Sequence, residues 1–172
     1  MRSGMRDLPY PASWTVERAL SAYLEENGFT REEYEKKWTP ASFLGVKFSV
    51  PNTKKHRWGI MLHDLHHVAT GFGTDLVGEG EISAWETRGG LYALGPYVGG
   101  IVFSGMLMGF IGSPRRALAA WRAGNRVLWA IDADYSDLLA MTVGELRSLL
   151  GIPQEGLATH PAKLHAYAPT SA

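Results

Sequence analysis

A stretch of 26 residues without a charged side chain, from Gly89 to Pro114, is the feature that most restricts how this chain can fold. Its centre, residues 98–111, is strongly apolar and suits either a membrane or a protein core. The Gly95-Pro96 pair and eight glycines leave fewer than the roughly 20 continuous apolar residues that a spanning helix needs. We therefore predict a buried central helix rather than a membrane span.

Small and flexible side chains within this stretch support a second interpretation, in which they leave a channel for an aliphatic ligand. These side chains are Gly99, Gly105, Met106, Met108 and Gly109.

Helix signals precede the uncharged stretch. Apolar residues recur at helical spacing over about 15–27, and Gly28 follows as a stop signal. Thr30 and Glu33 form a capping-box pattern that opens a short charged helix to about residue 38. We expect an extended loop over 40–52 and then a helix over about 53–70 that carries an apolar stripe from Trp58 to Ala69.

Three more helices are expected further along the chain. One begins near Glu79 and runs to about residue 87, and a second starts at the Ser113-Pro114 cap. The third opens with a capping box of Thr142 and Glu145 and ends at Leu150. The pattern predicts an all-α fold with a single helical domain over 15–153, an N-terminal arm over 1–14 and a tail over 154–172.

Composition excludes several classes of function. The 172 residues include 17 basic and 17 acidic side chains, and this neutrality argues against a nucleic-acid partner. The absence of cysteine excludes disulfides, iron–sulfur clusters and a thiol nucleophile. Residues 1–11 have no apolar run of the secretory kind, so we expect a cytoplasmic protein, peripheral to a membrane at most.

The strongest chemical signal lies between residues 63 and 79. On a helix, His63 and His67 lie one above the other with Asp64 beside them, so two imidazoles and a carboxylate can converge on one divalent cation. A glycine-rich turn over 71–78 then lets Glu79 return as a fourth ligand. This mixture of nitrogen and oxygen donors suits zinc or ferrous iron.

The apolar stripe lies opposite these ligands, which leaves two interpretations open: the polar face is solvated, or a second helix covers it and forms a lined cavity. His66 projects away from the other three and is predicted as a neighbour of the metal site. Glu81 and Glu86 are predicted to lie on a solvated helix face. A zinc peptidase is disfavoured because Asp64 stands where its motif requires a catalytic glutamate.

The arrangement His63-Asp64-x-x-His67, with eleven residues before Glu79, resembles the signature of the coenzyme Q biosynthesis protein 4 family. Similar segments surround it at 70–71 and 78–81, and a C-terminal one lies at 146–152. The resemblance covers roughly 15–153. It implies an all-helical protein with zinc or iron held by His63, Asp64, His67 and Glu79, which would also be the catalytic residues, beside an apolar cavity for a polyisoprenoid tail.

Members of that family act in ubiquinone biosynthesis. The implied reaction removes the ring carboxylate of a polyprenylated 4-hydroxybenzoate, with hydroxylation at the same carbon. We accordingly expect an aromatic, prenylated substrate, a homodimer and peripheral membrane contact. Two alternatives remain: a tailoring enzyme of secondary metabolism with a different aromatic or polyketide-like substrate, and a non-catalytic isoprenoid-binding scaffold of a biosynthetic complex.

Overall fold

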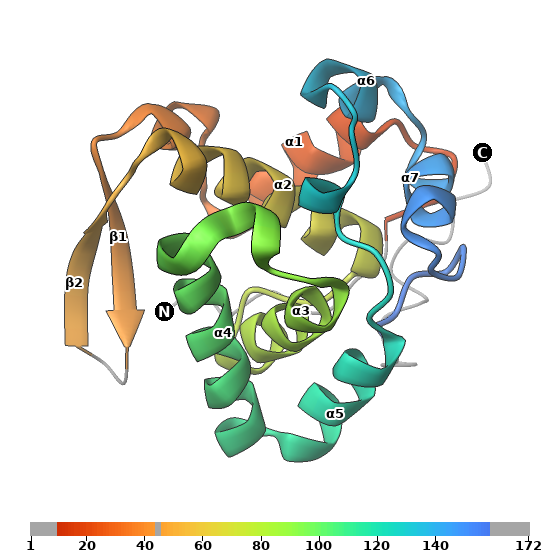
Figure 1. Ribbon diagram of the computed structural model, residues 1–172. Helices are drawn as coiled ribbons and strands as arrows, with labels where there is room; N and C mark the ends of the chain where they lie inside the picture. Colours follow the sequence, from red (N-terminus) through yellow and green to blue (C-terminus); the bar gives the residue numbers. More distant parts are fainter. Residues whose placement is uncertain (1–9, 44–45, 159–172) are drawn as a thin grey trace.

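Helices dominate the structure, which confirms the predicted all-α class (Figure 1). The computed structural model describes residues 10–43 and 46–158. The α-helices within these ranges are α1 Val16–Asn27, α2 Lys54–Thr70, α3 Leu76–Gly89, α4 Gly95–Gly112, α5 Pro114–Ala123, α6 Tyr135–Ala140 and α7 Val143–Leu150. The short 3-10 helices are η1 Arg31–Glu35, η2 Tyr92–Leu94 and η3 Leu128–Ala130.

Some of the helix ends predicted from the sequence are observed. Gly28 ends α1 with a φ of 71°, and Thr15 caps the start of this helix by accepting from the Arg18 backbone N–H. Pro114 begins α5 as expected, but the Ser113 side chain forms no capping hydrogen bond. Thr142 and Glu145 form the expected capping box at the start of α7. These local bonds satisfy backbone groups that a helix end leaves unpaired.

A β-hairpin replaces the extended loop predicted over 40–52. Strand β1, Trp38–Phe43, pairs antiparallel with β2, Val46–Pro51, so that Thr39 lies opposite Val50. The charged helix before it also ends earlier than predicted, at Glu35. Strand β1 contains Pro40, which lacks a backbone N–H, but both strands of a two-stranded ribbon are edges and edges tolerate proline.

Helix α2 lies in the interior, and its surroundings decide between the two interpretations of its polar face. From residue 62 to 70 every residue except His63 is buried, and α3 lies across the His63 and His67 side. A second helix therefore covers the predicted ligands. Trp58 is not part of the core stripe, since 39% of it is exposed.

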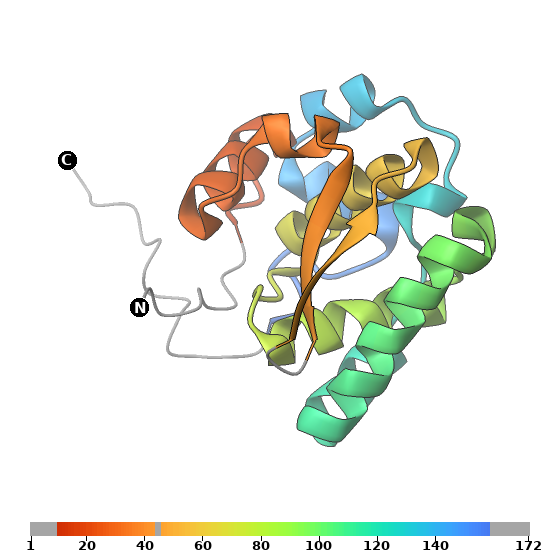
Figure 2. The same ribbon diagram turned by 90° about the vertical axis from the view of Figure 1, so that its left-hand side faces the viewer.

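Helix α4 is not the buried central helix that the sequence predicts. Only four of its residues are buried, and Phe103, Leu107 and Ile111 are exposed at 46%, 48% and 75%. Figure 2 shows α4 extending along the outside of the molecule together with α5. By length and apolar composition Tyr92–Gly112 is the one segment in the described ranges able to cross a membrane, and 28% of its most apolar window is buried.

Glycines explain how α4 packs against α3 although few of its residues are buried. A Cβ on Gly109 would lie 2.7 Å from Gly80 Cα, and one on Gly105 would lie 2.4 Å from Ser83 Oγ. The two helix backbones therefore approach directly at Gly80 and Gly109, and the Ser83 side chain fits against Gly105. Gly105 and Gly109 are therefore occupied by the contact with α3 and leave no room there for the aliphatic ligand that the sequence suggested.

The C-terminal end of α2 is fixed by α7 and the residues that follow it. The buried Arg147 donates from Nε to the Ala69 carbonyl at 2.8 Å and from Nη1 to the Gln154 carbonyl at 2.5 Å. The backbone N–H of Leu157 donates to the Thr70 carbonyl at 2.8 Å. Residues 154–158, predicted as part of a tail, thus cap the helix that carries His63 and His67; residues 159–172 lie outside the described ranges.

Candidate metal centre

Three of the four predicted ligands meet at one point between α2 and α3. His63 Nε2 and His67 Nε2 are 3.1 Å apart. The Glu79 carboxylate, in the first turn of α3 as predicted, lies 3.5 Å from His63 Nε2 and 3.6 Å from His67 Nε2. One ligand atom from each residue lies within 4.8 Å of the others, so the group can hold a metal ion.

The local sequence explains why Glu79 reaches the histidines. Gly71 ends α2 in the left-handed region, with a φ of 80°, and turns the chain. Asp75 then caps α3 by accepting from the Gly78 backbone N–H at 2.8 Å. A Cβ on Gly78 would meet Gly73 O at 2.1 Å, so only glycine allows this tight return.

Hydrogen bonds at the far side of each ring fix both imidazoles as ligands through Nε2. His67 Nδ1 lies 2.9 Å from the Phe72 carbonyl oxygen, an acceptor only, so Nδ1 carries the proton. His63 Nδ1 lies 2.8 Å from Glu86 Oε1 and donates in the same way. Metal-binding histidines typically donate their second N–H to a carboxylate or a carbonyl.

Two lone pairs and a carboxylate therefore point at one centre, with no donor among the three groups. Such a cluster is stable only around a proton or a cation. The two imidazole nitrogens are 3.1 Å apart, and each lies 3.5 or 3.6 Å from a different oxygen of Glu79. These separations are close to the edge of about 3.4 Å that bonds of about 2.0–2.1 Å give in a tetrahedral site. The donors present thus fit a zinc or ferrous ion.

Glu86 is buried and contacts two histidines, whereas the sequence predicted that it is solvated. Its side chain is fully buried on α3, and Oε1 accepts from His63 Nδ1 and from His66 Nδ1 at 2.7 Å. His66 in turn accepts at Nε2 from the Leu128 backbone N–H at 2.9 Å. His66 is therefore a neighbour of the metal site, as predicted, and it ties η3 to Glu86.

Glu81, the other acid predicted on a solvated face, is also buried. It pairs with Arg116 of α5 through two contacts of 2.6 and 2.7 Å. This ion pair joins α3 to α5 and is separate from the metal ligands.

Burial and the neighbouring charges shift the pKa values of His63 and Glu86 in opposite directions. Burial acts to lower the pKa of His63, but the carboxylates of Glu86 and Glu79 outweigh it and the pKa lies well above its ordinary value. For Glu86, burial acts to raise the pKa, yet His63 and His66 lower it to about 2. Without a metal, a proton on His63 thus compensates the charges of Glu79 and Glu86.

Asp64, the remaining predicted ligand, is held by two tyrosines. Its Oδ1 accepts from Tyr23 of α1 at 3.3 Å, and its Oδ2 accepts from Tyr34 of η1. Burial raises the pKa of Asp64 above its ordinary value, and burial together with Asp64 raises the pKa of both tyrosines. Each oxygen of Asp64 thus accepts from one tyrosine, and Asp64 is not part of the group formed by His63, His67 and Glu79.

A pocket of about 630 Å³ opens beside the candidate metal ligands. His63, Asp64 and Glu79 line it, together with Tyr23 and Tyr34, which hold Asp64. Its other lining residues are Leu24, Phe29, Thr30, Glu33, Thr39, Val50, His56, Ile60, Tyr97, Gly100, Ile101 and Ser104. This site pocket is mainly apolar and is closed in part by Tyr97, whose hydroxyl donates to the Pro51 carbonyl at 3.1 Å.

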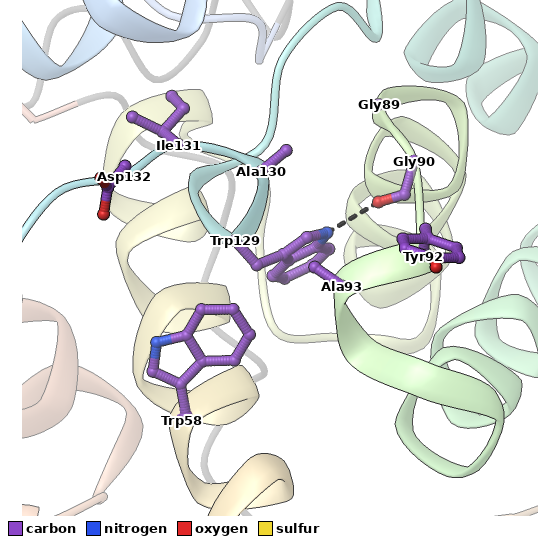
Figure 3. A pocket seen from close by; sticks show the side chains of 9 residues that line it. All are labelled: Trp58, Gly89, Gly90, Tyr92, Ala93, Trp129, Ala130, Ile131 and Asp132. Carbon is purple, nitrogen blue, oxygen red and sulfur yellow. Dashed lines mark hydrogen bonds between the residues drawn. The ribbon is translucent and has the colours of Figure 1, made fainter.

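A second pocket, also of about 630 Å³, lies on another side of α2 (Figure 3). Trp58 and Trp129 face it, Tyr92 and Asp132 lie at its edge, and the Trp129 indole N–H donates to the Gly90 carbonyl at 2.7 Å. It contains none of the predicted metal ligands.

Sequence patterns located the ligands but missed the groups that orient them. Glu86 could have been found, because it lies seven residues after Glu79 and hence on the same face of α3. Tyr23 was counted only among the apolar residues of α1. Tyr34 gave no signal, since its contact with the site depends on how η1 folds against α2. His56 lies seven residues before His63 and hence on the same face of α2, but the sequence did not show that the hairpin and α4 enclose it.

Comparison with known proteins yields no relative: no family model, no curated protein and no solved structure matches the chain.

Proposed function

We propose that the protein is a metal-dependent enzyme that removes the carboxylate group of an aromatic acid. The observation that supports it most is the convergence of three acceptors, His63 Nε2, His67 Nε2 and a Glu79 oxygen, at one end of an apolar pocket. The ligand spacing along the chain supports the same proposal through its resemblance to the coenzyme Q biosynthesis protein 4 family.

His63, His67 and Glu79 would hold the metal, and two imidazoles with one carboxylate suit zinc or ferrous iron. A bound ion supplies Lewis-acid polarisation of the substrate carboxylate, and ferrous iron also permits dioxygen chemistry. Glu86 and the Phe72 carbonyl keep both imidazoles in the ligand tautomer.

The remaining groups suit proton transfer at the ring. In simple decarboxylation the bond between the ring and the carboxylate carbon breaks, carbon dioxide leaves, and the ring carbon takes up one proton. Asp64, whose pKa is raised by burial, is placed to carry that proton in the wall of the pocket. Tyr23 and Tyr34 orient its carboxyl group, and the apolar lining excludes water.

A tailoring enzyme acting on a less lipophilic aromatic acid is the second candidate. The Thr39 hydroxyl in the pocket lining favours it, because this group has no partner among the described residues and a hydrocarbon tail would leave it unsatisfied. A non-catalytic isoprenoid-binding scaffold is the rival from another class, and it predicts that lipid co-purifies with the protein whether or not metal is bound.

Turnover separates these proposals. Protein loaded with Zn²⁺ or with Fe²⁺ is incubated with 4-hydroxybenzoate and with a 3-prenylated derivative, and products are identified by mass spectrometry. We expect loss of carbon dioxide from at least one acid. Asp64→Asn should reduce the rate by roughly 100-fold, while Glu35→Gln, a change at an exposed carboxylate, should not.

No turnover of either acid with either metal, combined with co-purified lipid that persists in His63→Ala, would support the scaffold instead. Turnover that is unchanged in Asp64→Asn would leave the enzyme proposal standing and remove Asp64 from it.

A further inference from the structure

His56 is a buried histidine in the wall of the site pocket, and its Nδ1 lacks a hydrogen-bond partner. The residue is 5% exposed, and no group in residues 10–43 or 46–158 bonds to the enclosed Nδ1. Its ring lies against Tyr97, with 6.0 Å between the centroids. Buried polar side chains are almost always bonded, and an apolar residue would fill the same space without this penalty.

The position of His56 relates it to the metal ligands. It stands seven residues before His63 on α2, hence on the same face and about 10 Å along the helix axis. Both residues line the site pocket, with Ile60 between them. The pocket lining thus contains two imidazoles about 10 Å apart along α2.

A second polar group without a hydrogen-bond partner lines the same pocket. Thr39 Oγ1, on β1, is enclosed and has no partner among the described residues. A ligand that is polar only at the metal end would leave both His56 and Thr39 unsatisfied, whereas a ligand that is polar at both ends can bond to them.

The imidazole suits a neutral partner. Burial lowers the pKa of His56, so the ring stays uncharged near neutral pH and offers one donor and one acceptor. A half-turn about the Cβ–Cγ bond exchanges nitrogen and carbon positions at little change in shape, so either nitrogen can meet a hydroxyl or a carbonyl group.

We propose that His56 binds a hydroxyl or carbonyl group at the far end of the ligand and so selects an elongated, two-ring phenolic acid over an acid with a hydrocarbon end. This inference rests on the proposed function, because it takes the ligand's carboxylate to lie at the His63–His67–Glu79 end. It names the substrate class of that same site.

Two probes that differ by one group test it. Biphenyl-4-carboxylate and 4′-hydroxybiphenyl-4-carboxylate share the acid and the rings, and only the second carries a hydroxyl group two rings away. Their affinities for Zn²⁺-loaded protein are measured by calorimetry for wild type, His56→Leu and His56→Asn. We expect the hydroxyl to improve wild-type binding about tenfold, with the gain lost in His56→Leu and partly kept in His56→Asn.

Trp58→Phe is the matched control, because Trp58 lies two residues along α2 and faces the second pocket (Figure 3); it should keep the full gain. Zinc content and thermal unfolding of each variant show that the site is folded. Equal affinity of both probes in zinc-loaded wild type, or an undiminished gain in His56→Leu, would overturn the role of His56 and leave the proposed function intact. Failure of both acids to bind the zinc-loaded protein would overturn the proposed function as well.

Discussion

At the scale of single residues, the site depends on Glu86 more than on any residue outside the ligand set. One buried carboxylate oxygen accepts from His63 and His66 at 2.8 and 2.7 Å, while Oε2 has no partner among the described residues. The negative charge of Glu86 therefore orients the ligand imidazole of His63 and ties it to His66. This explains why a glutamate is tolerated in the interior of α3.

Because Glu86 is charged in the folded state, we predict that the metal-free protein loses stability as the pH falls. Its pKa is lowered to about 2 from an ordinary 4.5, so its contribution to folding is present above pH 4.5 and is lost as the pH falls toward 2. The loss should be of the order of 3 kcal/mol. Urea unfolding in the presence of a chelator, at a series of pH values, measures it.

In Glu86→Gln this acid-dependent loss should disappear, with a lower stability at neutral pH, whereas Glu35→Gln should retain it. A Glu86→Gln protein whose stability falls with acid as steeply as that of wild type would show that other carboxylates are responsible.

At the scale of elements, the contact between α3 and α4 determines where the apolar helix goes. Gly80 and Gly109 bring the backbones together, so α4 needs only a narrow face for packing and leaves the remainder exposed. The absence of charge from Gly89 to Pro114 indicated burial, but it did not distinguish a helix covered on all sides from one packed through glycines. That choice depends on the small residues of the neighbouring helix.

Substituting alanine for two glycines of α4 should have opposite effects on stability, because one glycine is in a close helix contact and the other is not. A Cβ on Gly109 would meet the Gly80 backbone at 2.7–2.8 Å, so Gly109→Ala should destabilise the protein by roughly 2 kcal/mol. Gly100 lies on the same helix with nothing within 4 Å, so Gly100→Ala should stabilise by about 0.5–1 kcal/mol. Denaturant unfolding compares the two, and equal effects would contradict the close contact.

The same elements show what sequence patterns can predict here. Local signals such as the Gly28 stop and the Thr142 cap were reliable, because each involves residues within one turn. The spacing of His63, His67 and Glu79 was informative for the same reason, since one helix and one short turn bring them together. The β-hairpin and the burial of Glu86 could not be read locally, because each depends on a partner segment folding against it.

At the scale of the whole molecule, the exposed apolar side of α4 is the feature that the fold leaves uncovered. Phe103, Leu107 and Ile111 follow one another at intervals of four residues and form a stripe along the helix. A stripe of this kind usually marks a contact surface. It agrees with the homodimer and the peripheral membrane contact expected from the sequence, both of which stay predictions.

We expect the homodimer to form through this stripe. Sedimentation equilibrium should give a dimer for wild type and a monomer for the double variant Leu107→Glu, Ile111→Glu, with metal binding unchanged in both. A monomeric wild type that floats with anionic lipid vesicles would show instead that a membrane surface covers the stripe, and a variant that remains dimeric would place the interface elsewhere.

The central claim is that α2 and α3 hold one divalent metal ion through His63, His67 and Glu79, and the zinc affinity of purified protein tests it most directly. Competition with a chromogenic chelator should give one site per chain in wild type and a loss of at least about 100-fold in affinity for His63→Ala, His67→Ala and Glu79→Ala. Asp64→Asn, whose carboxylate is held by tyrosines, and Asp132→Ala, at the edge of the second pocket, should stay within about tenfold of wild type. Unchanged zinc affinity in all three ligand variants would contradict the account.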